Sequence, residues 1–190
     1  MDLVPPPGAS VDDISMNGLI AGEQVRRIEA MLGPAKMGRT LERIPGAERL
    51  RELTPVSEVP VRLLDELYVT VAEGEGQDVR MLQREIVYDS VASLLRGPWR
   101  AFVRVHSDEA LAARAPRIYA GAMGRGALSA KVVRAGLAEV RVTEWSGMWP
   151  LRINGLETSL RCLLESCGRR HVHLESFTTL DGACCFARWV

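Results

Sequence analysis

Four cysteines and two histidines lie close together in the sequence, and their residue types are those that bind zinc. The cysteines all fall between Cys162 and Cys185. Thiolate, imidazole and carboxylate groups suit Zn²⁺, and a helix packed against two strands can bring such ligands together. The residues that could supply the ligands are Cys167, His173, Glu175, Cys184 and Cys185. The alternative is that the thiols are buried as small apolar side chains while the histidines face solvent.

The spacing of the cysteines does not complete a zinc motif. Cys162 and Cys167 are five residues apart, so on a helix they point about 140° away from each other, and a Cys-x-x-Cys knuckle is absent. We therefore predict no cofactor, and zinc stays an alternative.

His106 is the residue that could bind haem. It follows the apolar stretch at residues 102–105 and precedes Pro116 by ten residues. A histidine on an inner helix can be an axial haem ligand, whereas a histidine at a helix end can instead be a cap or a surface group. Haem is thus a second alternative.

Aromatic residues are spread along the helical part of the chain and gather again near residue 147. Aromatic side chains between helices and a sheet can line an apolar ligand pocket, or they can form plain core. The candidates for a pocket lining are Tyr68, Tyr88, Trp99, Phe102 and Trp145. A second interpretation is that Trp145, Met148 and Trp149 form an exposed loop that anchors a protein partner.

Ordinary enzyme motifs are not visible. The paired carboxylates at 12–13, 65–66 and 108–109 lie among charged residues and are expected to be solvated. The glycines of Gly121-Ala122-Met123-Gly124-Arg125-Gly126 follow a helix and precede a strand, which is the reverse order of a phosphate loop. We predict no catalytic residues and no enzyme activity.

The composition excludes several classes. The chain has 190 residues, and its 24 basic and 24 acidic residues cancel, which argues against a general nucleic-acid binder. The chain has no run of eighteen apolar residues, so we expect no membrane-spanning helix. The first eight residues lack the basic and apolar regions of a signal peptide, so we expect a cytoplasmic protein.

The period of the apolar residues predicts an α+β fold. Residues 1–14 hold three prolines in a row and are expected to form a disordered or loosely docked arm. Residues 15–190 are expected to form one domain, with helices as far as a short helix that ends before Pro116. From about residue 127 the pattern predicts two strands, a helix and two strands, hence N-terminal helices packed with a C-terminal ββαββ antiparallel four-stranded sheet.

This order of elements resembles a superfamily that unites haem–nitric-oxide-binding domains, vinyl-reductase-type small-molecule-binding domains and Bet3-like vesicle-tethering subunits. Within it the chain is most similar to an uncharacterised bacterial family of about this length. The residues that carry the resemblance are 141–145 (Arg-Val-Thr-Glu-Trp), the helix from Gly155-Leu156 to Cys167-Gly168, and the ending Cys185-Phe186-Ala187-Arg188-Trp189.

The resemblance implies ligands that this chain matches only in part. His106 and Pro116 are similar to the proximal-histidine helix and following proline of the haem domains, but a Tyr-x-Ser-x-Arg propionate clamp is replaced by Val-Thr-Glu-Trp-Ser at 142–146. Glu175 with Cys184 or Cys185 matches the ends of the zinc pattern of vinyl-reductase-type domains, whose middle cysteine is Thr178 here. Cys167 or His173 could substitute. The Bet3-like branch needs no metal and works through dimerisation.

Three functional hypotheses follow. The first is a non-enzymatic sensory or regulatory module that binds an apolar small molecule or relays a signal through dimerisation, as a homodimer. The second is a protein–protein interaction or scaffold subunit of the Bet3-like kind. The third is a haem-based gas sensor.

Overall fold

The residue period changes near residue 127, and the structure changes from helix to sheet at the same place. The computed structural model describes residues 14–104, 107–145 and 148–190. The helices are α1 (Gly18–Leu32), α2 (Pro34–Glu42), the 3₁₀ helix η2 (Ala47–Arg51), α3 (Val61–Glu75), α4 (Val79–Arg96), α5 (Arg100–Val103), α6 (Asp108–Ala122) and α7 (Pro150–Ser166). The strands are β1 (Ser15–Asn17), β2 (Glu58–Pro60), β3 (Ala127–Arg134), β4 (Leu137–Thr143), β5 (His173–Thr179) and β6 (Gly182–Arg188).

The helices begin and end where local chemistry satisfies their free backbone groups. Asp78 and Ser107 accept hydrogen bonds from N–H groups in the first turns of α4 and α6. Gly76 ends α3 in the left-handed conformation, with φ of 64°, which glycine adopts without steric cost. Pro150 opens α7, where its missing N–H costs nothing. Local sequence therefore sets these four helix ends.

The predicted antiparallel sheet is confirmed, with strand order β3-β4-β6-β5. Val140 lies opposite Cys185 in the register of β4 and β6, and Cys185 lies opposite Ser176 in that of β6 and β5. Val140 and Cys185 are buried, whereas Arg141, next along β4, is exposed. Successive side chains of a strand point to opposite faces, so one face of the sheet joins the core and the other meets solvent.

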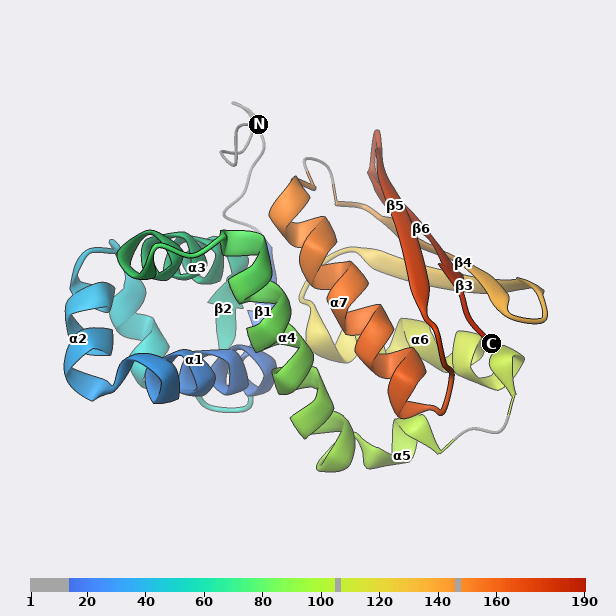
Figure 1. The fold of residues 1–190 in the computed structure, drawn as a ribbon, viewed down its shortest axis with the longest axis horizontal. Coiled ribbons are helices and arrows are strands. Elements are labelled where there is room, and N and C mark those ends of the chain that lie inside the picture. The colour runs from blue at the N-terminus through green and yellow to red at the C-terminus, as the bar shows by residue number, and fades with distance from the viewer. Residues whose placement is uncertain (1–13, 105–106, 146–147) are drawn as a thin grey trace.

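The core lies between this sheet and the N-terminal helices (Figure 1). α7 crosses in front of the sheet, and α4 packs against α7 on the other side. α1, α2, α3 and the short β1–β2 ribbon form the other end of the molecule. The predicted α+β fold is therefore confirmed, and α7 is the element that joins its two halves.

One predicted helix end is wrong. The sequence predicted that Pro116 ends the helix after Ser107, but α6 continues through it to Ala122. Proline removes one helical hydrogen bond. Leu111, Ala115 and Tyr119 are nonetheless buried at spacings of four residues, so packing on both sides of Pro116 holds the helix together.

The prediction that everything before residue 116 is helical is also incomplete. β1 and β2 pair antiparallel, with Met16 opposite Val59. Met16 also forms an isolated bridge with Met123, which ties this ribbon to the end of α6. Three residues are too short for alternation to reveal a strand in sequence. Within the described residues, no helix is long and apolar enough to cross a membrane.

Candidate functional site

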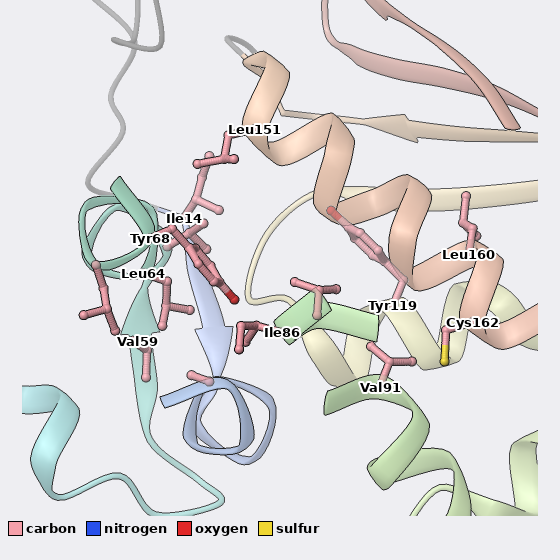
Figure 2. Close-up of a cluster of buried hydrophobic side chains, with 14 of the residues drawn as sticks. Ile14, Val59, Leu64, Tyr68, Ile86, Val91, Tyr119, Leu151, Leu160 and Cys162 are labelled. Carbon is pink, nitrogen blue, oxygen red and sulfur yellow. The ribbon is translucent and has the colours of Figure 1, made fainter. Parts of the chain in front are cut away.

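A largely apolar cavity of about 170 Å³ lies between the N-terminal helices, α6, α7 and the sheet. Leu64 and Tyr68 of α3 lie on one side of this region, and Tyr119 of α6 and Leu160 of α7 lie on the other (Figure 2). The size is close to that of an engineered apolar cavity of about 150 Å³ that binds benzene, and below the roughly 300 Å³ at which pockets for drug-sized ligands begin. The space is therefore suited to a molecule of about one ring.

The polar groups of this lining are few and mostly paired. The Tyr68 hydroxyl donates a 2.8 Å hydrogen bond to Oε1 of Gln24. Burial raises the pKa of Tyr68 well above its usual value, so this phenol stays protonated and donates. Gln83 accepts a 2.8 Å hydrogen bond from the side-chain amide of Asn154.

A buried ion pair stands at the wall of the cavity. Nε of Arg152, near the start of α7, donates a 3.1 Å hydrogen bond to Oδ2 of Asp65 on α3. Their side chains are 3% and 9% exposed. Desolvation raises the pKa of Asp65 to about 6, because burial outweighs the attraction of Arg152. This carboxyl can therefore take up a proton near neutral pH.

Two tryptophans cover the guanidinium of Arg152. Its Cζ lies 4.2 Å from the ring centroid of Trp149 and 5.5 Å from that of Trp145. Such cation–π contacts are worth about 2 kcal/mol or more when they are desolvated. Nη2 of Arg152 and Nε1 of both indoles are buried without a hydrogen-bond partner among the described residues.

The residues predicted to line a ligand pocket are divided by the structure. Tyr68, Trp99 and Trp145 line the cavity. Phe102 instead packs edge-on against Trp99, with ring centroids 6.5 Å apart. Tyr88 faces a polar surface groove and donates a 2.6 Å hydrogen bond to Glu165, which raises the pKa of Tyr88 to about 12.

The prediction that Trp145, Met148 and Trp149 form an exposed partner-binding loop is wrong, because all three side chains are buried. Trp145, Met148 and Trp149 are 5%, 5% and 7% exposed. Trp145 and Trp149 hold Arg152, and Met148 lines the cavity with Trp145. They face the interior because removing their large apolar surfaces from water lowers the free energy of the folded protein.

The five predicted zinc ligands do not come together. Cys185 faces the core, but Cys184 lies on the opposite face of the sheet because neighbouring strand residues alternate. Cys184 is nonetheless 2% exposed, whereas Phe186 on the same face is half-buried. His173 and Glu175 are exposed on β5, and Cys167 caps the far end of α7.

Within the part of the chain that the structure describes, no group of three or more His, Cys, Asp or Glu side chains is arranged to hold a metal ion. Burial raises the pKa of the Cys162 and Cys185 thiols to about 11. Both are protonated at neutral pH and pack as small apolar side chains.

The described cavity lining does not fit haem. None of its residues is a histidine or a cysteine. Its tyrosines, Tyr68 and Tyr119, have pKa values that burial raises, so the tyrosinate that would ligate iron is disfavoured. Arg152, the cation that could meet a propionate, already pairs with Asp65. His106, the predicted haem ligand, lies outside the described residues.

Sequence reasoning missed the Asp65–Arg152 pair. It expected Asp65 to be a solvated surface carboxylate, but Asp65 is buried. Helical spacing contains a signal, because Val61, Asp65, Tyr68 and Ala72 follow each other at four, three and four residues and so share one face of α3. A carboxylate within an apolar stripe indicates a buried partner.

The fold is that of known haem nitric-oxide/oxygen-binding (H-NOX) domains. A Cs H-NOX variant with 4-cyano-L-phenylalanine matches with a TM-score of 0.71 and 13% identity, over 92% of this chain and 96% of that one. An oxygen-binding H-NOX domain related to soluble guanylate cyclases matches with a TM-score of 0.68 and 12% identity, over 92% and 95%. An H-NOX mutant of T. Tengcongensis matches with a TM-score of 0.66 and 13% identity, over 92% and 97%.

No family model matches the sequence, and no match was found among curated proteins. Identities this low establish the shared fold alone. Of the superfamily predicted from the sequence, the structure shares the fold of the haem–nitric-oxide-binding branch, and the likeness to the vinyl-reductase-type and Bet3-like branches stays a prediction.

Proposed function

We propose that this chain is a non-enzymatic sensory module that binds a small apolar molecule in the cavity between its helices and its sheet. The observation that carries the proposal is the 170 Å³ cavity, because it lies where α3, α4, α6 and α7 meet. A ligand there contacts both halves of the fold at once. It can therefore favour one packing of α7 against the helices, which is what a sensor requires.

Filling the cavity is expected to abolish binding without unfolding the protein. Ala115 of α6 is buried and lines the cavity. Ala115→Leu should weaken the binding of toluene at least tenfold, because the added carbons occupy the ligand's space. The melting temperature should stay the same or rise, since filling a void restores packing contacts. Calorimetric titration and thermal unfolding measure the two effects.

Ala113→Leu is the matched control, because Ala113 lies on the same helix with its side chain exposed. It should bind toluene like the parent protein. If toluene binds neither the parent nor the control, or binds Ala115→Leu equally well, the cavity is not a ligand site and the proposal fails.

A haem-based gas sensor is the second candidate, and the observation that favours it is the H-NOX-like fold over 92% of the chain. The described lining argues against it, because it offers no imidazole or thiolate. The scaffold alternative loses its predicted anchor, since Trp145 and Trp149 are buried.

An absorption spectrum separates the two candidates. After haem reconstitution and removal of free haem, we expect no stoichiometric Soret band. A stoichiometric band that shifts or disappears in His106→Ala would instead establish the haem sensor, because it would identify His106 as the axial ligand.

A further inference from the structure

Three buried hydrogen-bond donors without acceptors among the described residues belong to Arg152, which lines the cavity, and to the two tryptophans that pack on its guanidinium. Nη2 of Arg152 and Nε1 of Trp145 and Trp149 are each buried and unpartnered within the described part of the chain. The Arg152 side chain is 3% exposed and lines the cavity, and both indole rings contact its guanidinium. Buried donors are almost always hydrogen-bonded in native proteins, so this group indicates a missing acceptor.

The chemistry of the missing partner follows from these donors. All three are N–H groups and none can accept a hydrogen bond. A guanidinium pairs best with a planar carboxylate, whose oxygens match its N–H groups in spacing and charge. The remaining lining is dominated by aliphatic and aromatic side chains, among them Val91, Leu95 and Leu160. A partner must therefore combine one acceptor group with a compact apolar body.

We propose that the ligand is a small apolar monocarboxylic acid, about one ring in size, whose carboxylate accepts hydrogen bonds from Arg152. This inference rests on the proposed function, because it assigns the ligand class of the same cavity. The ring or chain of the acid occupies the apolar space, and its carboxylate lies at the Arg152 end. The indole N–H of Trp145, which also lines the cavity, is a further donor there.

Asp65 must respond when a second carboxylate approaches Arg152. The groups that face Asp65 are Arg152 of α7, Glu66 of its own helix, and Tyr68 one turn along. Two ionised carboxylates beside one guanidinium leave a net negative charge in a largely apolar cavity, which is unfavourable. Because burial already raises the pKa of Asp65 to about 6, Asp65 takes up one proton from solvent, and Arg152 then pairs with the ligand.

Titration with benzoate, benzamide and toluene tests the assignment. Benzoate stays ionised between pH 6 and 8, since carboxylic acids titrate roughly two units lower. If binding requires protonated Asp65, benzoate affinity should fall about tenfold between pH 7 and 8, as the competent fraction falls by that factor. Affinity for benzamide and toluene should not change with pH. Calorimetry in buffers of different ionisation enthalpy should count about one proton taken up per benzoate.

Two variants locate the effect. Asp65→Asn should bind benzoate at least tenfold more tightly at pH 8 and lose the pH dependence, because its amide needs no proton. The double variant Asp65→Asn with Arg152→Met should lose benzoate and keep toluene. Arg188→Met, whose parent residue is exposed at the end of β6, is the matched control and should behave like the parent protein.

The outcomes separate this inference from the proposed function. Toluene binding with benzoate equal to benzamide at every pH overturns the carboxylate assignment and keeps the apolar site. Binding of none of the three probes overturns both. If the double variant does not fold, Asp65→Asn still decides, because an unchanged pH dependence in that variant contradicts the assignment.

Discussion

Arg152→Met is expected to destabilise the protein by about 3–5 kcal/mol at pH 8 and by less at pH 5. Removing one partner of a buried ion pair leaves the other charge uncompensated, and that cost is of this order. Here the remaining charge is Asp65, which lies buried between α3 and α7. At pH 5 Asp65 is mostly protonated, so the cost of an unpaired charge is removed. What remains is the loss of the packing and the cation–π contacts of Arg152 with Trp145 and Trp149. Urea denaturation at both pH values measures the difference.

The direction of the pH effect follows from the pKa of Asp65. Burial raises it from the usual 3.8 to about 6 in the folded protein. The folded state therefore holds this proton more tightly than the unfolded state, and the stabilisation is complete below pH 3.8 and lost as pH rises through about 6. Arg152→Met should raise the pKa further, since Arg152 is the group that lowers it. In Arg152→Met the stability should therefore keep falling with pH above 6, up to the raised pKa of Asp65.

The double variant Asp65→Asn with Arg152→Met controls this prediction. Replacing a whole buried ion pair by uncharged groups of similar volume is often neutral or stabilising. It should therefore recover most of the lost stability, and its stability should no longer fall between pH 5 and 8. Arg188→Met should change the unfolding free energy by less than about 0.5 kcal/mol. If Arg152→Met destabilises the protein equally at both pH values, an unpaired Asp65 carboxylate does not contribute to the loss of stability, and the prediction is wrong.

The sheet could be predicted from sequence because its pattern is local. Val140 and Val142 alternate with Arg141 along β4, and this alternation alone tells which face is buried. The helix ends could be predicted in the same way, because Asp78 and Gly76 act within one turn. Pro116 was misread since its local preference to end a helix is outweighed by packing of Ala115 and Tyr119, which the sequence does not display.

The candidate site could be predicted only in part, because its parts meet across long sequence separations. Arg152 and Asp65 are 87 residues apart. The sequence indicated Trp145 and Trp149 as candidate site residues, but it did not show that they are buried against Arg152. Sequence pattern shows which residues are unusual for their surroundings, and only the tertiary structure shows which of them are neighbours.

Gly182→Ala is expected to destabilise the protein by about 3 kcal/mol. In the structure a Cβ at this position would lie 2.0 Å from the carbonyl oxygen of Val142 and 2.9 Å from its carbonyl carbon. Backbone atoms cannot swing aside as a side chain can, so β4 and β6 would have to move apart at the end of the strand pair where β6 begins.

Gly74→Ala is the matched control for this substitution, because a Cβ on Gly74 would meet no atom within 4 Å. Gly74 lies in the last turns of α3, where alanine is favoured over glycine by up to about 1 kcal/mol. The same chemical change should therefore stabilise the protein at position 74 and strongly destabilise it at position 182, as thermal and urea unfolding would show. If Gly182→Ala unfolds like the parent protein, the close approach of Gly182 to Val142 does not require glycine at this position.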